Sequence, residues 1–134
     1  MLECLIIGDS IAVGTKQFAP HCELQGKGGI NTWQFNKMYK GKFEADAVII
    51  SLGSNDHKGV KTHKELLEMR QRIGAKNVFW ILPAGNLKAS EVPITKIQSI
   101  VKEIAESYGD IVLPIRGLQA DGIHPSWSGY KDIV

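Results

Sequence analysis

The sequence predicts an α/β protein in which a parallel sheet of about five strands lies between two layers of helices. Short apolar segments alternate along the 134 residues with segments whose apolar residues recur at helical spacing. The strongest apolar segments are apolar at consecutive positions, which is typical of strands covered by helices on both faces. We therefore expect a three-layer α/β/α sandwich.

Five segments are expected to be strands. They lie at 2–7, 21–24, 46–52, 78–82 and 111–113. Gly8 ends the first, because glycine accepts the φ that a sharp exit requires. The third leads into a polar turn at 53–57, and Pro83 and Pro114 end the last two. The second, at 21–24, is a short strand and precedes a glycine loop at 25–29.

Helices are expected between these strands and after the last one. The segment 11–19 ends at Pro20, and the segment 30–39 has apolar residues at helical spacing. Thr62 and Glu65 have the form of a capping box that begins a helix at 62–73. Pro93 suits the first turn of a helix at 94–108, which has an apolar stripe. A closing helix after Ser126 would be only a turn or two long.

Composition narrows the class of protein. Apolar residues make up 43% of the chain and the net charge is +2, which is too mild to favour nucleic acid or an anionic membrane as partner. The sequence has neither the long apolar run of a membrane span nor the pattern of a signal peptide. We expect one domain over residues 1–134, located in the cytoplasm or in a larger assembly such as a virion.

Two cysteines, Cys4 and Cys22, do not have the spacing of metal ligands. Their places at the first two strands allow them to lie near each other. We expect two buried, reduced thiols.

The polar residues with chemical potential follow the strands. Because parallel strands end at the same edge of a sheet, residues after them are expected to gather there. Ser10 is either the N-cap of the first helix or a nucleophile whose developing charge the helix dipole favours. Asp121 and His124 are either turn residues or the carboxylate and base that a serine nucleophile needs. Asn55 and the glycine pair at 28–29 are either turn residues or oxyanion donors.

Three of these segments carry a family resemblance. Gly8-Asp9-Ser10, Gly53-Ser54-Asn55-Asp56 and Asp121-Gly122-Ile123-His124-Pro125, with a glycine of the 28–29 pair, resemble the four sequence blocks of the SGNH, or GDSL, hydrolases. The resemblance implies a flavodoxin-like sheet and hydrolysis of carboxylic esters without a metal or other cofactor. Ile11 replaces the leucine of the family name, and the chain is short for the family.

The resemblance also implies roles for individual residues. Ser10 is the nucleophile, His124 the base and later the acid, and Asp121 the group that orients His124. The oxyanion hole consists of the Ser10 backbone N–H, the Asn55 side chain and a glycine N–H, for which we favour Gly29 over Gly28. Gly28, Asp9 and Trp127 are candidate substrate contacts.

Other aromatic and basic residues have simpler interpretations. Trp80 is expected in the core because it lies in a buried strand, and Trp33 is expected there because it lies on an amphipathic helix. His57 is interpreted as an exposed loop residue. The lysines at 58, 61 and 64 are interpreted as a solvated face.

The leading functional hypothesis is a serine esterase that removes small acyl groups, acetyl above all, from carboxylic esters. Esters of carbohydrates are among these substrates. The alternative is a catalytically weak or inactive module with the same fold, which binds or supports a larger assembly or a second copy of the chain. A third hypothesis, a metal-dependent phosphoesterase built on Asp9 and the 55–57 segment, lacks the histidines that such a site needs.

Overall fold

The computed structural model describes residues 2–85, 90–118 and 124–133. Its five parallel strands form one sheet in the order β2-β1-β3-β4-β5. The strands are β1 (Leu2–Gly8), β2 (Glu23–Gly26), β3 (Phe43–Ser51), β4 (Ile73–Ile81) and β5 (Ile111–Leu113). The helices are α1 (Ser10–Phe18), α2 (Thr32–Met38), α3 (Thr62–Gln71), α4 (Ile94–Tyr108) and α5 (Trp127–Ile133). The predicted fold class is confirmed.

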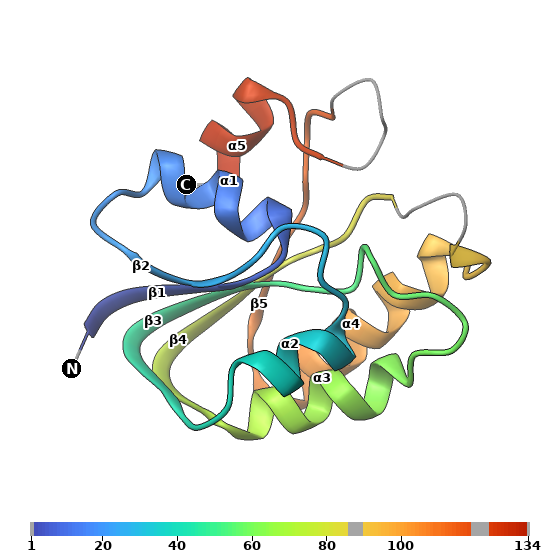
Figure 1. The fold of residues 1–134 in the computed structure, drawn as a ribbon. Coiled ribbons are helices and arrows are strands. Elements are labelled where there is room, and N and C mark those ends of the chain that lie inside the picture. The colour runs from blue at the N-terminus through green and yellow to red at the C-terminus, as the bar shows by residue number, and fades with distance from the viewer. Residues whose placement is uncertain (1, 86–89, 119–123, 134) are drawn as a thin grey trace.

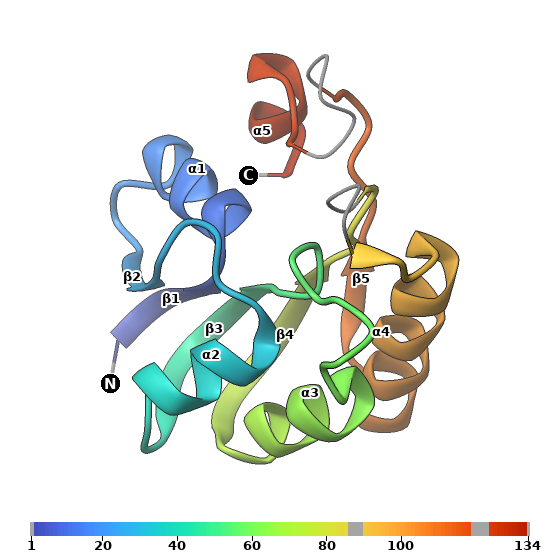
Figure 2. The ribbon, with the colours of Figure 1, turned by 45° about the vertical axis from the view of Figure 1, so that its right-hand side comes forward.

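Helices cover the sheet from both sides, as Figures 1 and 2 show. Apolar residues of α2, α3 and α4 pack with one face of the sheet in the larger core cluster, which includes Phe35, Leu66 and Val101. Helix α1 packs on the other face through Ile11 and Ala12, and α5 lies against α1. The apolar runs predicted from the sequence therefore face helices on both sides, as parallel strands require.

The strand register aligns the ends from which the polar loops leave. Gly8 is paired with Gly26 of β2 and with Ser51 of β3. A Cβ atom on Gly8 would lie 1.8 Å from the Ser51 carbonyl oxygen, and its φ is +138°. Only glycine fits this position, so the exit of β1 can lie directly beside the exit of β3.

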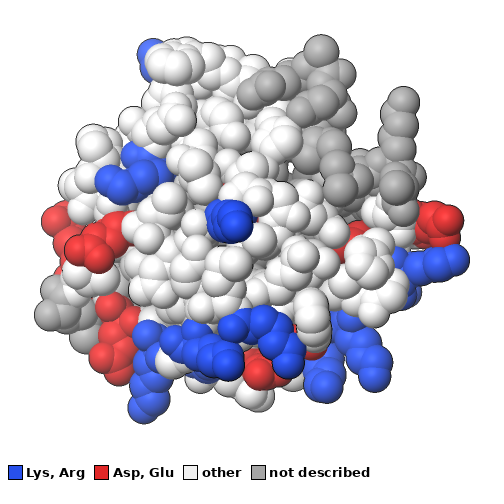
Figure 3. Space-filling model, viewed as in Figure 1, with Lys and Arg blue, Asp and Glu red and all other residues white. Residues whose placement is uncertain are grey.

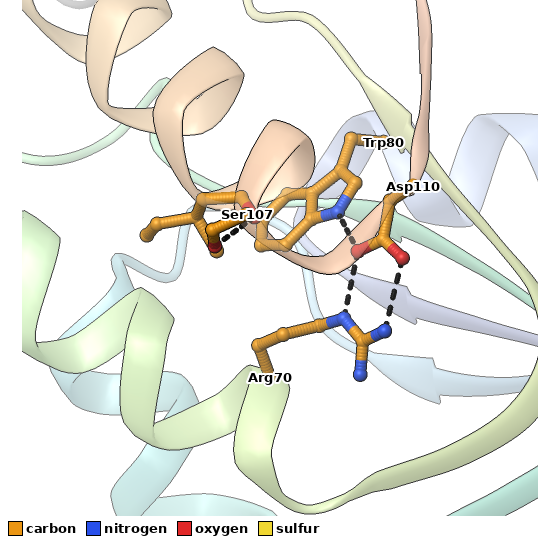
Figure 4. A network of polar contacts seen from close by, with 5 residues as sticks. Arg70, Trp80, Ser107 and Asp110 are labelled. Atoms are coloured by element: carbon orange, nitrogen blue, oxygen red, sulfur yellow. Dashed lines mark hydrogen bonds and ion pairs between the residues drawn. The ribbon is translucent and has the colours of Figure 1, made fainter.

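A buried ion pair joins α3 to Asp110, which lies in the turn between α4 and β5 (Figure 4). The Arg70 guanidinium donates to both carboxylate oxygens of Asp110, at 2.7 and 2.9 Å. The Trp80 indole N–H donates to the same carboxylate at 2.9 Å. The Arg70 and Asp110 side chains are only 10% and 4% exposed, so the carboxylate needs all of these donors.

The expectation of two reduced thiols is wrong, because Cys4 and Cys22 form a disulfide. The register pairs Leu5 with Glu23, which places the preceding residues of the two strands side by side. The bond closes the part of the chain that contains α1. Strand register decides this contact, and the spacing of two cysteines does not reveal it.

Two candidate helix caps also differ from the structure. Asp9, not Ser10, is the N-cap of α1, and its carboxylate accepts a hydrogen bond from the Ile11 N–H. Thr62 does not form a capping box, because α3 begins after Lys61 without a side-chain cap. The Thr62 hydroxyl donates to Asp56 at 2.7 Å instead. A long-range partner thus replaces the local one.

Two tryptophans have different environments. Trp80 is 1% exposed, which confirms its place in the core. Trp33 is 50% exposed, so its expected place in the core is wrong. Its helix buries Phe35, and a short helix offers few positions toward the sheet.

Among the described residues, no helix combines the length and apolarity that crossing a bilayer requires.

Candidate active site

Ser10 is the first residue of α1 and directly follows the exit of β1. The preceding Asp9 is fully buried and holds this junction in place. One oxygen of its carboxylate accepts from the Ile11 N–H at 3.0 Å and from the Ser51 hydroxyl at 3.1 Å. Ser10 is thereby left partly exposed at the N-terminus of a helix, where a negative charge is favoured.

His124 lies beside Ser10 although 114 residues separate them. The Ser10 Oγ and the His124 Nε2 are 2.5 Å apart, within hydrogen-bond distance. This is the contact that a histidine needs to take a proton from a serine hydroxyl. The structure therefore brings together two of the three predicted catalytic residues.

Helix α5 fixes the position of His124. The Phe18 ring of α1 contacts the rings of Trp127 and Tyr130, with centroid distances of 4.8 and 5.9 Å. The Tyr130 ring fits against Gly14, where a Cβ atom would lie 2.3 Å from it. The Ser126 N–H also donates to the Gly117 carbonyl at 2.9 Å. The close approach of Tyr130 explains why residue 14 is a glycine, which the sequence alone did not show.

Asp121, predicted to orient His124, lies outside the described residues. Its pairing with His124 stays a prediction.

The predicted oxyanion residues lie at the exits of neighbouring strands. The Asn55 Nδ2 donates to the Ile30 carbonyl at 2.9 Å, which fixes the plane of the amide and leaves its second N–H for another acceptor. Gly28 lies close to Ser10, since a Cβ atom on it would lie 3.7 Å from the Ser10 Cβ. Gly29 has a φ of +80° and open space around it. Gly28 is thus the glycine in contact range of the nucleophile, whereas Gly29 forms the left-handed turn beyond it.

Asp56 holds the Asn55 segment to α2, a role that the sequence analysis missed. Its buried carboxylate accepts from the Thr32 N–H at 2.9 Å, from the Thr32 hydroxyl at 2.8 Å and from the Thr62 hydroxyl at 2.7 Å. Burial raises the pKa of Asp56, and these hydrogen bonds act in the opposite direction. Its place after Asn55 at the exit of a buried strand was the available signal.

The electrostatics of the site centre on Asp9. Burial raises the pKa of Asp9 to about 7, although its hydrogen bonds and nearby His124 favour the charged form. The second carboxylate oxygen has no hydrogen-bond partner among the described residues. Asp9 is therefore a fully buried carboxyl at this junction, and its role as a substrate contact stays a prediction.

The other predicted contacts have varied environments. Trp127 is 68% exposed and packs edge-on against Phe18, so one side of its ring faces solvent. His57 is exposed, as expected, and its Nδ1 accepts from the Gly59 N–H at 3.0 Å.

Within the described ranges, the one cluster of three metal-ligating side chains is Cys4, His21 and Cys22. Cys4 and Cys22 are joined by the disulfide in this structure, so neither offers a thiolate to a metal ion. Asp9, Asp56 and His57, the ligands of the phosphoesterase hypothesis, do not form such a cluster in that part of the chain.

No protein-family model matches the chain, and no curated protein matches its sequence. Solved structures do match it. A GDSL-like lipase from Bacteroides thetaiotaomicron has a TM-score of 0.68 and 18% identity, and the match covers 98% of this chain and 83% of that chain. A member of the lipolytic protein G-D-S-L family from Veillonella parvula has a TM-score of 0.64 and 14% identity over 99% and 94% of the two chains.

A third similar structure is the C-terminal catalytic domain of peptidoglycan O-acetyltransferase A from Streptococcus pneumoniae. Its TM-score is 0.62 at 15% identity, over 98% of this chain and 87% of that chain. The chain therefore has the fold of GDSL-type hydrolases, as the sequence resemblance implied.

Proposed function

We propose that this protein is a serine esterase that removes small acyl groups, in particular acetyl groups, from carboxylic esters. The observation that carries the proposal is the 2.5 Å contact between the Ser10 Oγ and the His124 Nε2 at the carboxyl edge of the sheet. A serine and a histidine in this arrangement form the reacting half of a catalytic triad. We assign the third position to Asp121.

In the first half of the reaction, the Ser10 Oγ attacks the ester carbonyl carbon while His124 takes the hydroxyl proton. The carbonyl oxygen becomes an oxyanion, for which the Ser10 backbone N–H, the free Asn55 amide N–H and a backbone N–H of the 28–29 pair are the donors. The tetrahedral intermediate collapses to an acyl-serine, and His124 gives its proton to the departing alcohol oxygen.

In the second half, water attacks the acyl-serine and loses a proton to His124. The second tetrahedral intermediate collapses, His124 returns the proton to the Ser10 Oγ, and the carboxylic acid leaves. No step in this sequence requires a metal ion.

Two features support a small acyl group on a sugar. Two of the connections beside Ser10 are short, because β1 runs directly into α1 and the loop before α2 spans only residues 27–31. Such loops offer little wall for a long acyl chain. One protein of the same fold is named for the transfer of acetyl groups on peptidoglycan, which is a carbohydrate ester chemistry.

The proposal is tested by hydrolysis of p-nitrophenyl acetate and p-nitrophenyl butyrate, with and without a chelator. We expect activity that resists the chelator, favours acetate and falls by about 10³-fold or more in Ser10→Ala. Ser99→Ala is the matched control, since Ser99 is an exposed serine of α4.

Two outcomes contradict the proposal. A folded wild-type protein without activity supports the inactive binding module instead. Activity that the chelator abolishes and Ser10→Ala retains supports metal-dependent chemistry.

A further inference from the structure

Trp33 presents an aromatic face to solvent between two hollows of the surface. It is 50% exposed on α2, and it lines both a hollow of 450 Å³ and a second one of 420 Å³. The Lys37 Nζ lies 5.5 Å from the centre of its ring. Trp33 therefore connects two concave regions of the surface through one aromatic side chain.

Lysines surround this tryptophan. Lys61 and Lys64 line the first hollow, and Lys37, Lys40 and Lys64 line the second. Figure 3 shows Lys and Arg side chains gathered along the lower edge of the molecule, where Figure 1 places α2 and α3. We call the two hollows with Trp33 and these lysines the basic groove.

The acidic side chains of the basic groove do not balance its lysines. Glu65 lines both hollows, and its carboxylate accepts a hydrogen bond from the Asn36 amide at 2.9 Å. Glu68 lines the second hollow only. Arg72 adds a further positive charge there, while its guanidinium donates to the Asn36 side chain and to the Tyr39 and Gly41 carbonyls. The groove therefore has a positive field, which concentrates anions.

The basic groove lies beside the segments that carry and position Asn55. Asn31 and His57 line its first hollow. Asn31 directly follows Ile30, whose carbonyl accepts from the Asn55 amide, and His57 lies two residues after Asn55. The Asp56 carboxylate joins these two segments through Thr32 and Thr62. These contacts hold the first hollow of the groove next to the segment that carries Asn55.

We propose that the basic groove binds the sugar chain of an anionic glycan, one whose rings carry carboxylate groups, and presents its acyl ester to Ser10. This inference rests on the proposed esterase function and names its substrate class. The apolar face of a sugar ring fits an exposed indole, and lysine ammonium groups on flexible stems attract carboxylates at several positions along a chain. A lipid chain would require apolar walls, which a groove lined with four lysines lacks.

The binding half of the inference is tested with Ser10→Ala, which keeps the groove but cannot turn over substrate. We expect it to bind oligogalacturonate, in a titration by calorimetry, and to leave neutral dextran oligomers unbound. Binding should weaken as salt is raised, because exposed charge pairs are screened. Trp33→Ala should weaken it, and Lys61→Gln with Lys64→Gln should weaken it about tenfold.

The matched control removes the same charge elsewhere. Lys76 and Lys102 are exposed lysines of β4 and α4, so Lys76→Gln with Lys102→Gln should leave oligogalacturonate binding within about twofold of the parent. If this control lost as much oligogalacturonate affinity as Lys61→Gln with Lys64→Gln, the protein would be attracting the glycan through its net charge alone. That result would overturn the proposal that the basic groove is the binding site. Binding of a single-stranded oligonucleotide in preference to oligogalacturonate would overturn the proposal that the ligand is an anionic glycan.

The catalytic half uses the active enzyme on an acetylated polymer. The Lys61→Gln/Lys64→Gln variant should lose about tenfold in kcat/KM on acetylated polygalacturonate, whereas the Lys76→Gln/Lys102→Gln control should stay within about twofold of the wild type on the same polymer and on p-nitrophenyl acetate. Equal rates of variant and wild type on acetylated polygalacturonate would overturn the inference. Failure of the esterase proposal alone appears differently, as absent hydrolysis of every ester with glycan binding intact.

Discussion

Replacing Asp9 with asparagine tests the buried carboxyl next to the nucleophile. Burial raises the pKa of Asp9 from its ordinary 3.8 to about 7, so between these values the folded protein holds a proton that the unfolded chain has released. The stability that depends on this proton is complete below pH 3.8 and is lost as the pH rises to about 7. At 1.36 kcal/mol for each pH unit, the loss is at most about 4 kcal/mol.

Asp9→Asn removes the ionisation and keeps an oxygen that can accept from the Ile11 N–H and the Ser51 hydroxyl. The free energy of unfolding of both proteins is measured with urea between about pH 4 and about pH 8. Over this range it should decrease more in the wild type than in the variant, and the difference between the two decreases should be up to about 4 kcal/mol. Asp56, whose pKa is also raised, is common to both proteins and cancels.

Asp46→Asn is the matched control, because Asp46 is exposed on β3. Its stability profile should run parallel to that of the wild type. The account of Asp9 is refuted if the Asp9→Asn profile is also parallel to the wild type, since the folded and unfolded carboxyl would then titrate alike.

Three further perturbations have defined outcomes. Asn55→Ala should lower kcat for p-nitrophenyl acetate by about 10²-fold to 10³-fold, because it removes an oxyanion donor, whereas an unchanged kcat would exclude Asn55 from that role. Asp110→Ala should lower the urea-derived free energy of unfolding by about 3–5 kcal/mol, since it leaves the buried Arg70 charge without its partner; a loss below about 1 kcal/mol would contradict this. Reduction of the Cys4–Cys22 disulfide should lower Tm and cost about 3 kcal/mol, and an unchanged Tm would contradict the bond.

Much of the fold could be predicted because β1 and the second halves of β3 and β4 are apolar at consecutive positions. The five expected strands all exist, and their order places the exits of β1, β2 and β3 side by side. The bounds were less predictable: β4 begins at Ile73, five residues before the expected start. Its first residues pair with β3 but are partly exposed, so they lack the apolar run that marks a buried strand.

The candidate site was predictable where a local motif carried it. Ser10 and His124 are brought together as expected. Ser10 comes directly after the end of β1, and His124 lies between β5 and α5. The roles of Asp9 and Thr62 depend on contacts with Ser51 and Asp56, which are distant in sequence. Local capping rules could not reveal them, since a tertiary partner competes with the helix terminus.

The exposure of Trp33 was also beyond local pattern. A seven-residue helix has room for few side chains against the sheet, and Phe35 occupies that place with 0% exposure. Helical periodicity alone does not say which aromatic residue of such a helix faces inward.

Covalent labelling of the nucleophile tests the central claim most directly. The wild-type protein would be incubated with a small sulfonyl fluoride, and the site of modification found by mass spectrometry of the intact protein and its peptides. The account predicts one adduct on Ser10, much slower formation in His124→Ala because the base at 2.5 Å is gone, and no adduct in Ser10→Ala. A folded wild-type protein that stays unmodified, or an adduct that forms equally fast without His124, would contradict it.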